Sequence, residues 1–319
     1  MFWSILTCLL FTSNALHLPA GNGFSRNPSY SSSNPGRKGF SNSPSSSTPN
    51  TNSKMKESLE AAIQESIDQT PGLREAMSYY ENLSAQGAED KEDLLQIERN
   101  SPWSKAQVHQ KLLEVTWDTS ARFRENRHQN SVISYEAEHF LMEIAEQALQ
   151  NTNLQPRILD VGCGTGILFK YIKQFSSMKK LFIKDEDMYG IDLSSEMIKI
   201  CREKYPSSVF TTGDFLKYSP EGILFSSVVL NECLHNFMET QNALRHAVNL
   251  LHSGGHLIVS HPRGYSNVLT QHRANKWLVP SVLPSEKEWE NVISKDLGLE
   301  MIITPKLKSN QYLAVSKKV

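Results

Sequence analysis

The first 56 residues of this 319-residue chain contain no aspartate or glutamate, although they carry five lysines or arginines. The rest of the chain holds 28 basic and 34 acidic residues, a net charge of −6. Proteins whose main partner is a nucleic acid need lysine and arginine to neutralise phosphates. The acidic body therefore argues against nucleic acid, and we expect no such partner.

Long apolar runs are also missing. The apolar run Phe2–Thr12 is too short to span a bilayer, but it resembles the hydrophobic part of a secretory signal over residues 1–15. Residues 16–56 are rich in Ser, Asn, Pro and Gly, a composition typical of a disordered transit peptide. Together they resemble the bipartite leaders of plastid proteins. Secretion, or retention in an endomembrane lumen, is the alternative, and we expect no transmembrane segment in the mature chain.

Cysteine is scarce. Beyond the leader only Cys163, Cys201 and Cys233 remain, and they lack the spacing of metal ligands, so we expect no metal site. Secreted proteins tend to pair their cysteines. An odd number of thiols therefore favours a reducing compartment such as the plastid stroma.

The centre of the sequence reads as a strand, a glycine loop and a helix. The run Ile158–Val161 predicts a strand buried on both faces of a parallel sheet, and helical spacing resumes over Ile167–Phe175. Between them lie Gly162, Gly164 and Gly166, which permit positive φ and close approach of a ligand to the backbone. Free N–H groups at the helix start would face an anionic group. The pattern predicts a nucleotide-type ligand.

The dinucleotide fingerprint G-x-G-x-x-G is absent, because Ile167 occupies its sixth position. The motif D-x-G-x-G-x-G instead resembles the class I S-adenosylmethionine-dependent methyltransferases. That resemblance implies S-adenosyl-L-methionine as the cofactor, and a nicotinamide-dependent oxidoreductase or an unrelated tight turn are the alternatives. The loop residues that would contact the cofactor are Asp160, Gly162, Cys163, Gly164 and Gly166.

Two further acidic residues follow predicted strands. Asp192 ends the second strand, where a carboxylate can accept both ribose hydroxyls; the alternative is a cap for the helix at 194–205. The segment from Gly190 through Leu193 resembles the second motif of the family. After the third strand, the resemblance implies that Asp214 accepts the adenine amine and that Phe215 lies against the base.

The remaining strands complete an α/β fold. Residues 223–230 predict a fourth strand that leads to Asn231, a cofactor-site candidate at the edge where open α/β sheets bind ligands. Residues 250–260 read as a helix end, a Gly-Gly turn and a fifth strand. Two strands, 299–304 and 311–316, follow without an intervening helix. We expect a Rossmann-like, doubly wound sheet of seven strands with an antiparallel last pair, helices on both faces and an N-terminal helical extension.

Three regions are predicted: a leader at 1–56, a helical extension or cover at 57–133, and a methyltransferase domain at 134–319. Ser101-Pro102 and Ser134 read as helix starts. In the family such a cover often closes the acceptor pocket. Four aromatic residues of this region are expected in the core: Trp117, Phe123, Tyr135 and Phe140.

Catalytic candidates are few. His235 and His261 follow strand ends and titrate near neutral pH, so either can serve as a general base where the acceptor loses a proton; a structural hydrogen bond is the alternative. Arg263, His272 and Arg273 either bind an anionic group of the acceptor or lie on a solvated face.

Several acceptors are argued against. The Asn/Asp-Pro-Pro-aromatic motif for base amines is absent after Asn231, and no Pro-Cys for cytosine methylation is present. Glu232 and Glu239 resemble the acid pair of arginine methyltransferases without its wider motif. We therefore expect methyl transfer to a small-molecule acceptor in a plastid. A non-catalytic binding or assembly factor with the same fold is the alternative.

Overall fold

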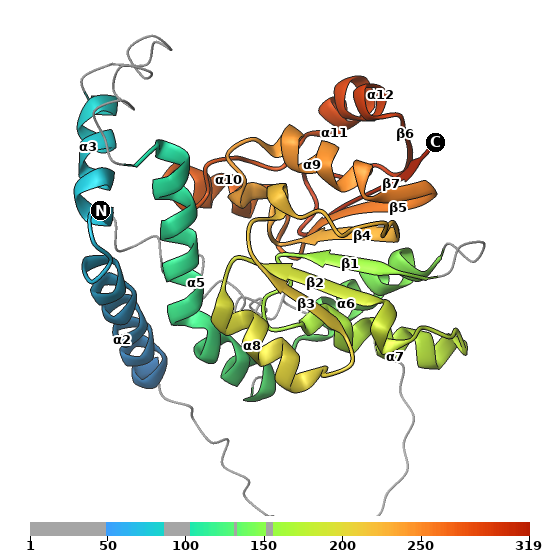
Figure 1. Ribbon diagram of the computed structural model, residues 1–319, viewed down its shortest axis with the longest axis horizontal. Helices are drawn as coiled ribbons and strands as arrows, with labels where there is room; N and C mark the ends of the chain where they lie inside the picture. The colour runs from blue at the N-terminus through green and yellow to red at the C-terminus, as the bar shows by residue number, and fades with distance from the viewer. Residues whose placement is uncertain (1–48, 86–102, 131–132, 151–155) are drawn as a thin grey trace, which may run out of the picture.

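The computed structural model describes residues 49–85, 103–130, 133–150 and 156–319 (Figure 1). The first 48 residues lie outside these ranges, so the predicted leader stays a prediction. Its last residues, 49–56, differ from the prediction of disorder because they begin helix α2 (Pro49–Asp68). Good helix formers such as Lys54, Met55 and Lys56 favour this N-terminal extension of the helix.

Seven strands form one sheet in the order β3-β2-β1-β4-β5-β7-β6. The strands β1 to β5 are parallel, whereas β7 runs antiparallel to both β5 and β6. This confirms the predicted seven-stranded, Rossmann-like sheet with an antiparallel last pair. The strand bounds are β1 Ile158–Val161, β2 Met188–Asp192, β3 Val209–Thr212, β4 Phe225–Asn231, β5 Leu251–His261, β6 Leu299–Ile303 and β7 Tyr312–Lys318.

Helices cover both faces of the sheet because successive strand residues point to opposite sides. Ile158 packs with α6, α7 and α8, whereas its neighbour Leu159 belongs to the core that includes α9 and the N-terminal helices. The helix bounds after residue 130 are α6 Tyr135–Leu149, α7 Ile167–Lys179, α8 Ser195–Lys204, α9 Thr240–Asn249, α10 Gly264–Ala274, α11 Glu286–Glu288 and α12 Ser294–Leu297. Short η helices lie at Asp185–Asp187, Phe215–Lys217, Leu234–Asn236 and Trp289–Ile293.

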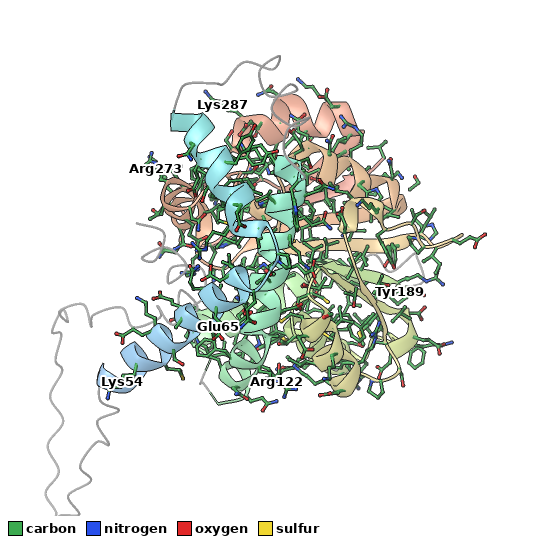
Figure 2. The ribbon with its side chains drawn as sticks, turned by 60° about the vertical axis from the view of Figure 1, so that its left-hand side comes forward. Lys54, Glu65, Arg122, Tyr189, Arg273 and Lys287 are labelled. Carbon is green, nitrogen blue, oxygen red and sulfur yellow. The ribbon has the colours of Figure 1, made fainter. Side chains whose placement is uncertain are left out.

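The N-terminal helices form one packed unit with the sheet domain. Figures 1 and 2 show α5 (Lys105–Asn130) between the sheet and the pair formed by α2 and α3 (Leu73–Ala85). Ile63 of α2, Leu73 of α3 and Leu112 of α5 are fully buried in the same core as the strands. The helical extension therefore has a fixed position beside the sheet.

Two local predictions turned out differently, and a third lies outside the described residues. The third is the helix start at Ser101-Pro102; the described part of α5 begins at Lys105 after a Ser104–Gln107 capping box. Gly254-Gly255 lies inside β5, at an irregularity opposite β4, and not in a separate turn. Tyr135 is 76% exposed at the start of α6, so its prediction as a core residue was wrong.

Two other predictions in this region are confirmed. The Oγ of Ser134 accepts the Ala137 N–H and caps α6. Phe140 is buried, while Trp117 and Phe123 are partly buried against the core. Across the described stretches of the chain, none of the helices has the length and apolar character needed to cross a membrane.

Candidate active site

A cavity of about 360 Å³ opens at the carboxyl ends of strands β1 to β5. The sequence order of the strands reverses between β1 and β4, and such switch points are where open α/β sheets bind ligands. Its volume is within the range of small-molecule and cofactor sites. All twelve site residues predicted from the sequence belong to the loops around this cavity, and all but Gly166 line it. Their individual roles stay predictions.

The glycine loop after β1 has the backbone that its sequence predicts. Gly162 and Gly166 have φ values of 66° and 75°, which disfavour residues with a side chain. A Cβ atom at Gly162 would lie 2.7 Å from the Cβ of Cys233. Glycine is therefore required there by both conformation and space.

Four N–H groups of this loop donate to acceptors inside the protein. Those of Gly162 and Cys163 both donate to the carbonyl of Ile191, at 2.8 and 3.1 Å. The Gly164 N–H donates to Asp192, and the Gly166 N–H donates to the Cys163 carbonyl. The loop is thereby held in place against β2. The predicted anion site at the start of α7 (Ile167) involves other N–H groups and stays a prediction.

Asp192 has a fixed carboxylate at the end of β2. Its Oδ2 accepts the Gly164 N–H and its Oδ1 accepts the Ser194 N–H, both at 2.9 Å. The N-cap of α8 is Ser194, so capping is not the role of Asp192. A carboxylate has about four acceptor positions. Two therefore remain for a pair of vicinal hydroxyls.

Asp160 lies beside this carboxylate on the floor of the cavity. Burial raises the pKa of Asp160 well above its usual range, and the nearby charge of Asp192 adds to the effect. Burial also raises the pKa of Asp192, while its two backbone donors and Arg124 act in the opposite direction. Asp160 is therefore the member of the pair that holds a proton more readily.

The far end of the cavity is formed by the loop after β3. The Oδ1 of Asp214 accepts the Leu216 N–H at 3.0 Å and starts a short helix. The ring of Phe215 is buried and packs against Phe237 and His246. Leu193 and Leu216 line the cavity between these groups, so a flat apolar ring fits this end.

The loop after β4 contributes polar groups to the middle of the cavity. The Oδ1 of Asn231 accepts the Ser260 hydroxyl at 2.9 Å, which fixes the amide. Glu232 follows with a φ of 56°, in the left-handed region that non-glycine residues rarely adopt. Its backbone strain places an acidic side chain on the cavity wall next to Asn231.

His235 and His261 meet on this wall. Their ring centroids lie 5.2 Å apart, edge to face. Burial lowers the pKa of both to about 3, with His261 and Arg263 adding to the effect on His235 and Arg263 adding to that on His261. Both imidazoles are therefore neutral at physiological pH. The Nδ1 of His261 accepts the Arg263 N–H at 3.3 Å, which puts the ring proton on Nε2.

Helix α5 forms the cavity wall opposite the glycine loop. The sequence did not identify which residues line this wall. His109, Leu113, Trp117, Arg124 and His128 all line the cavity. They have no motif of their own, and the signal that was available, an amphipathic helix in an N-terminal cover, does not say which side chains face the site. The structure supports the expectation that the extension closes the pocket.

Polar contacts fix α5 to the cofactor loops. The carboxylate of Glu125 accepts from Lys204 at 3.0 Å, and the same ammonium donates to the Thr165 carbonyl at 2.8 Å. His128 contacts the Thr165 hydroxyl. Asp118 accepts both the Ser194 hydroxyl and the Glu196 N–H at the start of α8. One helix thereby touches the glycine loop and the β2 exit together.

Some candidates lie away from the site. Arg273 is exposed on α10 (Figure 2), and His272 bonds the Val279 carbonyl, so of the three basic candidates only Arg263 lines the cavity. Trp289 is buried and donates to Tyr312. Glu239 reaches the rim of the cavity.

The three cysteines among the described residues, Cys163 in the glycine loop and Cys201 and Cys233 next to it, are free and buried. Cys201 donates to the Gly164 carbonyl at 3.1 Å, and Cys233 donates to the Val161 carbonyl at 3.0 Å. In the part of the chain that the structure describes, no group of three or more His, Cys, Asp or Glu side chains is arranged to hold a metal ion.

Residues 159–259 match a family model described as a methyltransferase domain. A putative methyltransferase, 235L, of Invertebrate iridescent virus 6 is 30% identical over 102 residues, which is 32% of this chain and 36% of the viral protein. The ubiquinone/menaquinone biosynthesis C-methyltransferase UbiE of Wigglesworthia glossinidia brevipalpis is 28% identical over 117 residues, 34% of this chain and 44% of that protein. The demethylmenaquinone methyltransferase of Chlorobaculum tepidum is 32% identical over 108 residues, 34% of this chain and 41% of its own length.

The chain thus spans less than half the length of these curated relatives. Among solved structures, the magnesium protoporphyrin IX methyltransferase ChlM from Synechocystis PCC 6803 with bound SAH is 14% identical, with a TM-score of 0.47 over 66% of this chain and 100% of that one.

Proposed function

We propose that this chain, whose residues 159–259 match a methyltransferase domain, is a class I methyltransferase that transfers a methyl group from S-adenosylmethionine to a small-molecule acceptor. The observation that supports this most is a single cavity that joins Asp192, the glycine loop and Asp214 to the buried pair His235 and His261. The first three match the needs of a nucleoside, and the histidines stand where an acceptor would enter.

The donor side fits S-adenosylmethionine in shape and chemistry. The two acceptor positions left on Asp192 suit the ribose hydroxyls, and the apolar end beside Leu216 and Asp214 suits adenine with its amine. Bound there, the compound supplies an electrophilic methyl group on a sulfonium that leaves as a neutral thioether. The contribution of the protein is to hold the acceptor in line with that methyl group in a space without water, an effect that can supply roughly 7–11 kcal/mol.

The acceptor side favours an uncharged molecule. Leu113, Phe237 and Met238 give it apolar walls, and His235 and His261 are neutral. With its proton on Nε2, His261 donates a hydrogen bond to a heteroatom of the acceptor and so orients it. An imidazole with a pKa of about 3 takes a proton only when negative charge develops beside it.

Three observations support a small molecule over a macromolecule. The cavity is closed on one side by α5. Outside residues 1–56 the chain is acidic, which disfavours nucleic acid. Two of the relatives described above are named for the biosynthesis of ubiquinone or menaquinone, both small molecules, or for the methylation of demethylmenaquinone.

Titration calorimetry with S-adenosylmethionine, followed by transfer of its labelled methyl group, tests the proposal. Plastid extract is split into a filtrate below about 1 kDa and a protein fraction, and label is expected in the filtrate. Label in the protein fraction would show that the acceptor is a protein and not a small molecule. Binding without transfer to either fraction would favour the non-catalytic assembly factor, and no binding would refute the proposal.

Two substitutions separate donor binding from turnover. Asp192→Ala should abolish donor binding, because the ribose hydroxyls lose their acceptor. His261→Ala should leave donor affinity within about threefold and lower turnover by roughly 10²–10³-fold, in the range for a positioned acid–base group. Calorimetry and a methyl-transfer assay measure the two effects. Loss of donor binding in His261→Ala would contradict this division.

We also propose that residues 1–56 direct the protein to a plastid. Their composition, free of acids and rich in serine, supports this. A fluorescent protein fused behind residues 1–56 should enter the plastids of an alga with secondary plastids, whereas residues 1–15 alone should lead to secretion. Secretion of both fusions would exclude the plastid.

A further inference from the structure

S-adenosylmethionine carries a carboxylate on its methionine part, and the cavity offers that anion few partners. With the ribose at Asp192 and adenine toward Asp214, the methionine part lies between the glycine loop and α5. The N–H groups of Gly162, Cys163 and Gly164 already donate to protein acceptors. These three N–H groups are therefore not free to neutralise the anion.

The acidic side chains near the loop further disfavour a ligand carboxylate. Asp192 and Glu232 are acidic and line the same space, so a ligand carboxylate meets repulsion there. The anion needs a cation on the opposite wall, which is α5. The cavity lining contains two arginines, Arg124 on α5 and Arg263 after β5.

Arg124 stands at the donor end and Arg263 at the acceptor end. The charge of Arg124 acts on Asp192 and on His128, the residue that touches Thr165 of the glycine loop. The charge of Arg263 acts on His261 and also on His235. Only Arg124 is therefore placed to reach the methionine part of the donor.

The side chain of Arg124 is held in position but forms no ion pair. Its guanidinium lies 5.1 Å from the ring centroid of Trp117, about two turns before it on the same helix. No carboxylate among the described residues lies within ion-pair distance of it. A partly buried arginine that faces a cavity and forms no ion pair is suited to an anionic ligand.

We propose that Arg124 binds the methionine carboxylate of the donor through charge-assisted hydrogen bonds, and that the site thereby selects adenosyl compounds that keep this carboxylate. This rests on the proposed binding of S-adenosylmethionine in the cavity. The N-terminal extension is then part of the donor site, because α5 carries the arginine that binds the donor carboxylate.

The test compares two ligands that differ only in the carboxylate: S-adenosylhomocysteine and its decarboxylated form, S-adenosyl-3-thiopropylamine. Titration calorimetry is run on the full chain as wild type, Arg124→Gln and Arg122→Gln. Arg122 is exposed on the same helix (Figure 2) and serves as the matched control. Circular dichroism and thermal unfolding check that each variant is folded.

The wild type should bind S-adenosylhomocysteine roughly 10–100-fold more tightly than the decarboxylated compound, the range for a hydrogen bond to a charged group. Arg124→Gln should lose that preference by weakening only the first ligand, Arg124→Lys should restore part of it, and Arg122→Gln should behave as wild type.

Two results overturn the assignment while donor binding stands: Arg124→Gln keeps the wild-type preference, or it weakens both ligands equally. If the folded wild type binds neither ligand, the proposed function itself falls.

Discussion

His235 and His261 make the stability of this protein depend on pH. In the unfolded chain an imidazole has a pKa of about 6.5, whereas in the folded protein burial lowers both values to about 3. Below pH 6.5 the unfolded chain therefore binds protons that the folded protein does not. Stability is complete above about pH 6.5 and is lost as the pH falls toward 3, at a cost on the order of 2 kcal/mol per imidazole by pH 5.

Unfolding in urea at pH 7.5 and at pH 5 measures this effect. The pair should lower the free energy of unfolding of the wild type on the order of 4 kcal/mol between the two pH values. His261→Asn, which takes no proton, should lose about half of that dependence. His139→Asn, at an exposed position on α6, should keep all of it. An unchanged dependence in His261→Asn would mean that His261 is not the buried, neutral group described here.

At the scale of single residues, sequence motifs placed the cofactor loops well but did not identify the opposite wall. Asp192 and Asp214 were found because each ends a strand of a recognisable pattern. Arg124 and His109 were not, since a helix without a motif does not reveal which of its polar side chains face a ligand. The motif also did not reveal that the N–H groups of Gly162 and Cys163 donate to the Ile191 carbonyl of β2.

The joint between α5, α8 and the glycine loop is the contact on which the shape of the donor site depends. Lys204 of α8 bridges Glu125 of α5 and the Thr165 carbonyl of the loop. The side chain of Glu125 is 9% exposed and that of Lys204 is 27% exposed. An ammonium that is mostly withdrawn from water needs its carboxylate.

Glu125→Gln removes that charge with little change of shape. We expect it to lower the free energy of unfolding by about 1–3 kcal/mol, less than for a fully buried pair, and to weaken donor binding. Chemical denaturation and calorimetry measure the two effects. Lys111→Gln breaks the Lys111–Glu114 pair on the same helix, which is more exposed than the Glu125–Lys204 pair, and should cost less than about 1 kcal/mol. Equal losses in both variants would show that the joint is no stronger than a surface pair.

At the scale of elements, the hydrophobic periodicity of the sequence identified the strands but did not give the residues at which strands and helices begin and end. Gly254-Gly255 resembled a turn, yet strand pairing with β4 carries β5 through it by means of a bulge. Helix α5 starts at Lys105 because a capping box between Ser104 and Gln107 satisfies its first N–H groups. Such ends are decided by local hydrogen bonds that composition does not reveal.

For the molecule as a whole, donor binding should stabilise the fold because the site joins the sheet to α5. A ligand at 100 times its dissociation constant adds about 2.7 kcal/mol to the free energy of unfolding. S-adenosylmethionine should then raise Tm by about 5–10 °C in a chain of this size, and NADH at the same concentration should leave it unchanged. A shift with NADH alone would revive the oxidoreductase alternative.

The architecture was predictable because the order of motifs along the chain determines the order of parallel strands in a doubly wound sheet. The position of the N-terminal helices was not, since α2 and α3 carry only an apolar stripe that can pack on many surfaces. Ile63 and Leu73 became core residues through their packing on α5, which no local pattern specifies.

The thiol of Cys201, on α8 beneath the glycine loop, is fully buried and donates to the Gly164 carbonyl. A reagent in solution reaches this sulfur only when the loop and α8 separate. The rate of its alkylation therefore measures that motion, and a ligand bound above the loop would lower the rate without touching the sulfur atom.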